Sequence, residues 1–264
     1  MVRREDEELR GLFARLGDLL ARSEQGETVM SAFLSPAEQH HAEAFLRGRG
    51  ATFSFWGGFE DAERKRAYLL PDYMEMGEIL TDTLEAYGID ASILTLRITG
   101  SGYKTLGHRD FLGALLGLGL ERSVLGDISV NEEGTEAFLF CDAVIAGFIE
   151  SEMQTVGNDK VKICRVQAEE CVIPKRRTQP ISDTVASPRL DSVVATLCGL
   201  SRERARQTVV SGLVELNYES EDRPDRTVAS GSTVSVRGFG KYRILSVEDR
   251  TKKGRFRLSA EKYL

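Results

Sequence analysis

Residues 201–217 read SRERARQTVVSGLVELN, and this stretch decides the fold of the C-terminal part of the chain. Ser201 is a favoured N-cap, and Ala205 and Val209 fall on one side of the helix that would follow it. Gly212 ends that helix, and residues 213–217 alternate in polarity as a half-buried strand does. A helix that leads directly into a strand indicates a small α+β domain.

A second helix is predicted just before this one, and Gly199 ends it. Its apolar residues recur at helical spacing and form one stripe: Leu190, Val193, Val194 and Leu197. In the helix after Ser201, Arg202 and Arg206 are four residues apart and project from the same face. Like charges at this spacing repel, so a bound anion would be favourable, and the planar guanidinium group suits phosphate oxygens.

Two glycine-containing basic clusters follow. After a strand predicted at 228–236, residues 237–243 read RGFGKYR, and residues 252–257 read KKGRFR. Glycines expose backbone N–H groups, aromatic rings can stack on bases, and cations suit a nucleic-acid backbone. Each cluster alone also fits a solvated hairpin tip, but several in one domain favour a nucleic-acid-binding rim.

The net charge of −6 hides an asymmetry. Residues 175–264 contain 18 Lys and Arg against 11 Asp and Glu, a net charge of +7, so residues 1–174 carry −13. A basic tail on an acidic body is typical of a protein whose one end meets a polyanion, although charge also varies along chains without such a cause. The acidic half could instead recruit a protein partner.

The middle of the chain has a regular order of elements. Strands and helices are predicted in the order β-α-β-β-α-β, at 92–98, 109–120, 126–130, 137–141, 143–156 and 160–166. This order is typical of the ferredoxin-like fold, which RNA-recognition (RRM-like) domains share with many unrelated proteins. The aromatic strand motif that lets such a sheet stack bases is not found in this sequence.

The predicted fold class is therefore α+β with three parts. Residues 1–74 form an N-terminal α/β segment, with an apolar helical stripe before residue 35, a helix start at Ser35-Pro36-Ala37-Glu38 and two short strands. Residues 75–170 form the ferredoxin-like domain, which a helix at 76–87 opens. Residues 167–186 form a connector that contains a strand, and 182–264 form the C-terminal domain.

The C-terminal order of R-L-D, then S-R-x-x-A-x-x-x-V-x-x-G-x-V-x-x-N, then V-R-G-F-G resembles the alpha-L RNA-binding motif, here called the S-four domain. The resemblance covers about residues 182–247. In that family the two helices and the following hairpin form one RNA-binding surface. Carried over to this chain, it implicates Arg189, Arg202, Arg206, Asn217, Arg237 and Lys241, although Asn217 would also suit a turn. The basic clusters add Arg243, Lys252 and Lys253.

Three further stretches resemble bacterial YlmH-like proteins: FWGGFEDAERKR at 55–66, LGHRDFLGALLG at 106–117 and GDI at 126–128. This resemblance spans nearly the whole chain. It implies a cytoplasmic, non-catalytic RNA-binding protein that acts on the ribosome, mainly the large subunit, in rescue of stalled translation. It also implies ribosomal RNA and tRNA as partners and a link to cell-division gene clusters.

The predicted turn at 100–109, GSGYKTLGHR, invites a nucleotide-binding interpretation. It lacks the third glycine of a dinucleotide fingerprint and the Lys-Ser/Thr of a phosphate loop, so no cofactor is expected. Lys104, His108 and Arg109 could contact RNA phosphates from such a turn. In the charged run at 60–66, Arg64, Lys65 and Arg66 could do so too, although a solvated turn with local ion pairs is the stronger expectation.

No catalytic or metal site is expected. The chain has 4 Cys and 3 His, but no C-x-x-C pair and no H-E-x-x-H spacing. The alternative function is an RNA-modifying enzyme, of pseudouridine synthase or methyltransferase type, with the C-terminal domain as anchor. Asp191 lies in the small helical domain, not in the large sheet domain that a synthase needs. No signal peptide or membrane span is predicted, so the expected location is the cytoplasm.

Overall fold

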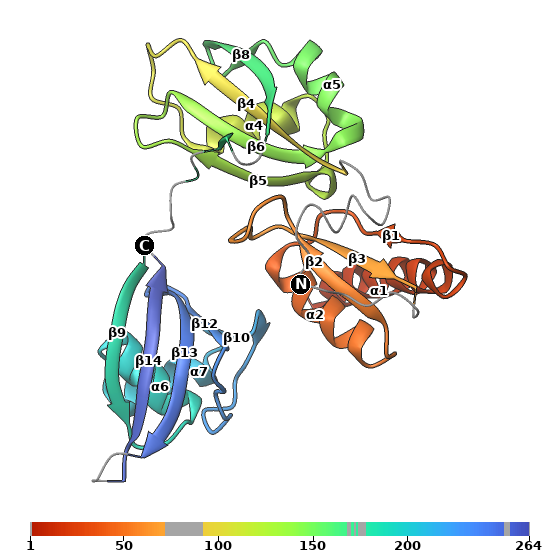
Figure 1. The fold of residues 1–264 in the computed structure, drawn as a ribbon. Helices are drawn as coiled ribbons and strands as arrows, with labels where there is room; N and C mark the ends of the chain where they lie inside the picture. The colour runs from red at the N-terminus through yellow and green to blue at the C-terminus, as the bar shows by residue number, and fades with distance from the viewer. Residues whose placement is uncertain are drawn as a thin grey trace. The chain divides into compact units, whose positions relative to one another are not determined.

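The computed structural model describes residues 2–71, 92–167, 170–171, 173, 178–250 and 254–263. The chain divides into two compact units, Met1–Pro174 and Lys175–Leu264 (Figure 1). The helix expected at 76–87 and the domain boundary expected after residue 74 lie outside the described residues.

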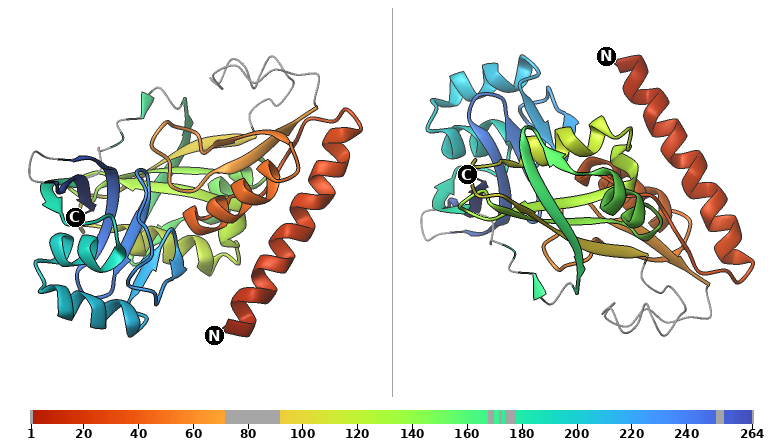
Figure 2. Two further views of the ribbon diagram at one scale, coloured as in Figure 1. Left: turned by 90° about the horizontal axis from the view of Figure 1, so that it is seen from below. Right: turned by 90° about the horizontal axis from the view of Figure 1, so that it is seen from above.

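The first unit begins with helix α1 (Val2–Glu24), which Figure 2 shows as one uninterrupted helix in red. Its apolar stripe, with Leu12 and Leu16 fully buried, packs in one cluster with α2 (Pro36–Arg47) and a three-stranded antiparallel sheet. The sheet has the order β1-β3-β2, with β1 at Val29–Met30, β2 at Thr52–Trp56 and β3 at Arg66–Leu70. Across the described ranges, none of the helices combines the length and apolar character that a bilayer span requires.

Helix α2 starts where the sequence predicts. Ser35 N donates to Glu38 Oε2 at 2.7 Å, Glu38 N donates to Ser35 Oγ at 3.3 Å, and Pro36 stands in the first turn. This reciprocal capping box satisfies two N–H groups that a helix start leaves without partners. The predicted start of α2 is therefore confirmed.

A five-stranded antiparallel sheet forms the second part of this unit, in the order β5-β6-β4-β8-β7. Its elements are β4 (Ile93–Gly100), α4 (His108–Gly117), the 3-10 helix η1 (Arg122–Val124), β5 (Leu125–Val130), β6 (Glu136–Asp142), α5 (Ala143–Glu152), β7 (Thr155–Val156) and β8 (Asp159–Val166). Apart from η1 and β7, this is the predicted β-α-β-β-α-β succession. Residues such as Ile98, Phe111 and Ile149 form one core between the sheet and its helices.

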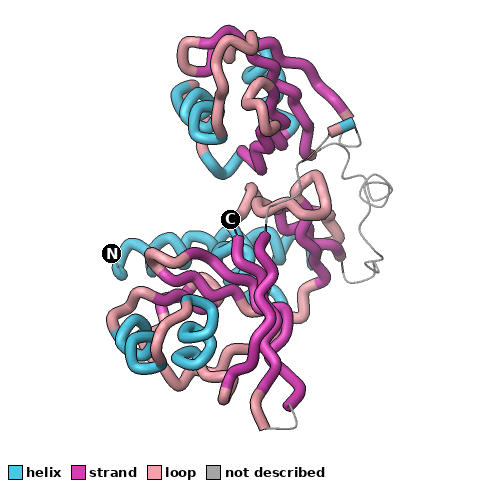
Figure 3. The backbone as a smooth tube through the Cα atoms, turned by 90° about the vertical axis from the view of Figure 1, so that its left-hand side faces the viewer, coloured by secondary structure: helices cyan, strands magenta, loops and turns pink. Residues whose placement is uncertain are grey.

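The second unit is a six-stranded antiparallel sheet with two helices. The sheet has the order β11-β10-β12-β13-β14-β9. The elements are β9 (Thr178–Val185), α6 (Leu190–Cys198), α7 (Arg202–Val210), β10 (Val214–Leu216), β11 (Glu219–Ser220), β12 (Thr233–Val236), β13 (Gly240–Arg250) and β14 (Phe256–Tyr263). Figure 3 shows the two helices of this unit (cyan) together beside the long strands (magenta) that lead to the C-terminus.

Strand β9 shifts the expected boundary of this unit. The sequence places the C-terminal domain from residue 182, but β9 begins at Thr178 and pairs with β14 from Thr178↔Tyr263 to Val185↔Phe256. Strand β14 therefore lies between β9 and β13 in the sheet, and the strand predicted within the connector is an edge strand of this unit.

Candidate nucleic-acid interface

The two helices of the second unit meet at a tight turn. Gly199 ends α6 in the left-handed region, with a φ of 64°, and Ser201 Oγ accepts from Arg204 N at 3.3 Å to cap α7. Leu190 and Val193 on α6 and Val209 on α7 are buried in the shared core. This packing places Arg189, just before α6, and Arg202, the first residue of α7, at neighbouring helix starts.

A buried carboxylate joins these two arginines. Asp191 in the first turn of α6 is 3% exposed. Its Oδ1 lies 3.3 Å from Arg189 Nε and its Oδ2 lies 3.4 Å from Arg202 Nε. The arginine side chains themselves are 43% and 58% exposed. One buried negative charge thus contacts two cations whose side chains remain partly exposed.

Arg206 and Arg237 are two further exposed arginines of this unit. Arg206 is exposed and stands one helical turn after Arg202 on the same side of α7. Arg237 is exposed in the turn between β12 and β13, and its backbone N donates to Leu213 O at 2.9 Å, directly after α7. Below, "arginine cluster" means Arg189, Arg202, Arg206 and Arg237. Its one described acidic partner is Asp191, so the cluster offers excess positive charge to a phosphate backbone.

Lys241 and Arg243 lie elsewhere. Tyr242 between them is 1% exposed and belongs to the core under the helices. Because successive side chains of a strand point to opposite faces, Lys241 and Arg243 project from the face of the sheet that α6 and α7 do not cover. The residues that the S-four resemblance and the basic clusters group together therefore occupy two faces. Lys252 and Lys253 lie outside the described residues.

Asn217 has a structural role in this unit. With a φ of 52° it adopts the left-handed conformation after β10. Its N donates to Thr233 O at 2.8 Å, and its Oδ1 accepts from Thr233 N at 2.9 Å. The side chain that could have reached RNA instead completes the pairing between β10 and β12.

In the first unit, the predicted turn connects β4 to α4 and presents Lys104, His108 and Arg109 at the surface. Ser101 N donates to the carboxylate of Asp159 at 3.1 Å, and Leu106 N donates to Gly134 O at 2.8 Å, so both ends of the turn are anchored. Desolvation, aided by the positive charge of Arg122, lowers the pKa of His108 below its ordinary value. At neutral pH, His108 therefore offers a hydrogen bond rather than a charge.

Comparison with known proteins places the chain in a family. The chain is 31% identical over 239 residues to the "Ribosome-associated protein quality control protein P2" of Bacillus subtilis (strain 168), which covers 90% of this chain and 89% of that protein. A family model described as "Putative RNA-binding domain in YlmH" matches residues 90–170. The chain belongs to the YlmH family.

A solved structure of a YlmH protein agrees with the fold. The "Cell division protein ylmH from Streptococcus pneumoniae" superposes with a TM-score of 0.52 at 19% identity, over 64% of this chain and 95% of that chain. The matched YlmH domain, residues 90–170, contains the whole five-stranded sheet.

Other side chains of the first unit cover one face of this sheet at β6. Phe138 and Phe140 on β6 are 4% and 0% exposed, and the ring of Phe140 packs on Phe59, with 4.8 Å between centroids. RNA-recognition domains stack bases on exposed aromatic rings of their sheets. Phe138 and Phe140 are buried and cannot act in this way, so the exposed turn with Lys104 and Arg109 is the better candidate for a contact in the matched domain.

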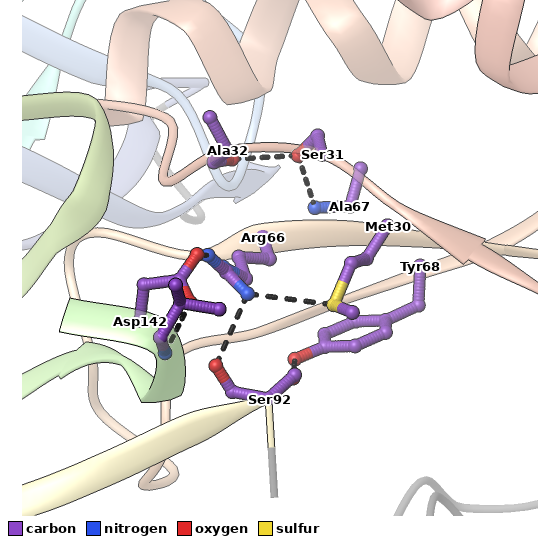
Figure 4. Close-up of polar contacts among 9 residues, drawn as sticks. Met30, Ser31, Ala32, Arg66, Ala67, Tyr68, Ser92 and Asp142 are labelled. Atoms are coloured by element: carbon purple, nitrogen blue, oxygen red, sulfur yellow. Dashed lines mark hydrogen bonds and ion pairs between the residues drawn. The ribbon is translucent and has the colours of Figure 1, made fainter. Parts of the chain in front are cut away.

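Two predicted RNA contacts of the charged run are wrong. Arg66 is 4% exposed, forms an ion pair with Asp142, and donates from Nη1 to Ser92 O at 3.1 Å (Figure 4). Arg64 directs its guanidinium to backbone carbonyls, with Nε 2.8 Å from Leu125 O. Both side chains join the N-terminal part to the five-stranded sheet, so their guanidinium groups are engaged within the protein and not offered to RNA.

Lys65 also makes a contact within the charged turn, because its Nζ lies 3.5 Å from Glu60 O. The sequence interpretation treated Asp191 only as an unsuitable catalytic residue and missed its role between two arginines. An acidic residue in R-L-D, followed by an arginine at the next helix start, is the signal that could have revealed it. The distance of eleven positions between Asp191 and Arg202 hides this contact from local pattern analysis.

Proposed function

We propose that this YlmH-family chain binds structured RNA of the ribosome through the arginine cluster, and acts in ribosome-associated quality control of stalled translation. The observation that carries the proposal is the buried Asp191 carboxylate, which contacts Arg189 and Arg202 at two neighbouring helix starts while their side chains stay 43% and 58% exposed. Such preorganised arginines suit phosphate oxygens, because less side-chain entropy is lost on binding. The name of the Bacillus subtilis relative supports the ribosomal setting, and the matched family domain supports RNA as the ligand.

We further propose that the second unit is an S-four RNA-binding domain and that the five-stranded part of the first unit is a ferredoxin-like domain. The two adjacent helices followed by the β12–β13 hairpin support the first assignment, and the β-α-β-β-α-β order supports the second. The docking partner we propose is the large ribosomal subunit, with ribosomal RNA as the main ligand and tRNA as a second. This role would place the protein in the cytoplasm.

The proposed role is binding without catalysis. The most strongly shifted groups have structural positions: burial raises the pKa of the Cys141 thiol to about 12, so this thiol stays protonated at neutral pH inside the core. Burial likewise raises the pKa of Tyr242, whose hydroxyl lies 3.8 Å from Cys198 Sγ in the other core. A nucleophile or general base needs the opposite, a reactive form available near neutral pH.

Arg206→Ala/Arg237→Ala is expected to weaken binding to the large subunit at least about tenfold and to lower the slope of log affinity against log salt by about two, since each lost phosphate contact releases about one counterion fewer. The measurement is co-sedimentation with separated ribosomal subunits over a salt series. This pair avoids Arg189 and Arg202, whose charges compensate Asp191.

The matched control is Arg204→Ala/Arg257→Ala, which removes the same charge from exposed arginines of the same unit. Arg204 lies on α7 only two residues from Arg206 and therefore faces another side of the helix. Equal loss in both variants would show that only overall charge matters. If the wild type pellets with neither subunit at low salt, the proposed function is wrong.

A further inference from the structure

The face of the C-terminal sheet that the helices leave uncovered has its own chemical character. On β12, β13 and β14 the buried residues Val234, Tyr242 and Ala260 point into the core. The alternate residues of the same strands are exposed or half-buried. Below, "open face" means the surface formed by Ser235, Lys241, Arg243, Glu261 and Tyr263, together with the ring of Tyr218.

Tyr218 reaches this face from an unfavourable backbone conformation. Its φ is 69°, and it and Asn217 are the two non-glycine residues with positive φ in the described ranges. A bulky side chain is rare in this region of φ, and such positions persist where the surrounding structure or function requires them. Glycine would occupy the same turn without steric cost. The tyrosine ring is therefore held at this position although its backbone conformation is unfavourable.

Lys241 connects Tyr218 to a second ring. Its Nζ lies 4.9 Å from the centroid of Tyr218 and 5.5 Å from the centroid of Tyr263. The three side chains come from the β10–β11 turn, the start of β13 and the end of β14, so they form a row across the sheet. Two aromatic rings and an ammonium group in a row, with Arg243 two positions further along β13, combine stacking surfaces with positive charge.

We propose that the open face binds an unpaired nucleotide of the RNA whose structured part the arginine cluster holds. A nucleobase stacks on the ring of Tyr218 in place of the ammonium group, and Lys241 then pairs with the adjoining phosphate. Single-stranded bases suit this surface because every base presents a π-face, whereas paired bases in a helix do not expose theirs. This inference rests on the proposed function, since it assumes that the same unit binds RNA.

The test compares three RNAs with the full-length protein by fluorescence anisotropy: a short hairpin, the same hairpin with an unpaired 3′ extension of adenosines, and the same extension without bases. The wild type is expected to bind the adenosine extension about 5- to 150-fold more tightly than the plain hairpin, as expected for stacking of one base. The abasic extension should increase affinity over the plain hairpin only slightly, by the contribution of its phosphates.

Tyr218→Gly should remove the gain from the adenosine extension and leave affinity for the plain hairpin unchanged. Its thermal midpoint should not fall, because glycine relieves the left-handed conformation, whereas a purely structural tyrosine would lower the midpoint when removed. Tyr218→Phe keeps a ring and should keep the gain.

The outcomes separate the two proposals. A wild type that binds none of the three RNAs overturns the proposed function, and with it this inference. A wild type that binds the plain hairpin but gains nothing from the adenosines, or gains as much from the abasic extension, overturns the inference alone. So does a Tyr218→Gly protein that keeps the full gain.

Discussion

Asp142→Asn is expected to lower the free energy of unfolding of the first unit by about 3 to 5 kcal/mol, the range for removal of one partner from a buried ion pair. Arg66, the partner, is 4% exposed, and its Nε has no hydrogen-bond partner in the described part of the chain. Asn at this position can still cap α5, where Asp142 Oδ1 accepts from Val144 N at 3.0 Å. The substitution therefore removes the charge and keeps the cap.

Replacing Asp142 should lower the free energy of unfolding more than replacing Arg66 does. Asp142 is 23% exposed, so water can solvate its carboxylate when Arg66 is replaced. Arg66 has no such access; among the described residues it keeps Ser92 O, Met30 Sδ at 3.4 Å from its Nη1, and the ring of Phe33, whose centroid lies 4.8 Å from its Cζ. Arg66→Met should thus cost less than Asp142→Asn, and the double variant should cost less than Asp142→Asn alone.

Urea unfolding followed by tryptophan fluorescence measures this effect in the right unit. The chain has 1 Trp, and Trp56 on β2 pairs with Arg66 on β3. Its emission therefore reports the first unit whatever the second unit does. A cost below about 1 kcal/mol for Asp142→Asn, the range of an exposed pair, would contradict the interpretation of this contact as buried.

The elements that the sequence predicts well are those with local signals. The capping box at Ser35 and Glu38 fixes the start of α2, because its hydrogen bonds join residues three apart. The β-α-β-β-α-β order follows from periodicities that lie within each element. Helix α5 was expected to reach residue 156, but it ends at Glu152, and Thr155 and Val156 pair with Lys160 and Asp159 in a hairpin that the apolar pattern does not reveal.

The stretch at 57–66 shows where local signals fail. Gly58 has a φ of 98°, and a Cβ there would lie 2.4 Å from the Phe140 ring, so this glycine permits the contact between Phe59 and Phe140. Asp127 accepts from Glu63 N at 2.7 Å and from Arg64 N at 3.0 Å. These contacts join residues more than sixty positions apart. The high charge of this run predicts a solvated turn, whereas tertiary contacts hold it between two hydrophobic clusters.

The candidate site was predicted in part. Arg189, Arg202 and Arg206 were selected as one surface, and the structure brings Arg189 and Arg202 to the same carboxylate. The family resemblance groups Lys241 with them, and the contiguous basic stretch at 237–243 adds Arg243. The alternation of β13 around the buried Tyr242 separates them, which follows from knowing the strand and the face that is buried.

Arg189→Met/Arg202→Met is expected to lower the free energy of unfolding of the second unit by about 3 kcal/mol or more, because it leaves the buried carboxylate of Asp191 without a positive partner. Methionine preserves much of the apolar length of arginine, so the loss reports charge rather than packing. Adding Asp191→Asn to this pair should recover most of the loss, since the buried charge is then gone.

Hydrogen exchange of amides in α6 and β14 measures this unit, which contains no tryptophan. Recovery in the triple variant would establish Asp191 as the group that requires the two arginines. If the double variant is as stable as the wild type, the carboxylate is solvated and does not hold Arg189 and Arg202 in place. Recovery in the triple variant also bears on RNA binding. Replacing Arg202 alone would then both remove a phosphate contact and destabilise the domain, so a loss of binding would have two causes. Replacing Arg206 and Arg237 removes phosphate contacts without exposing Asp191 to this loss of charge compensation.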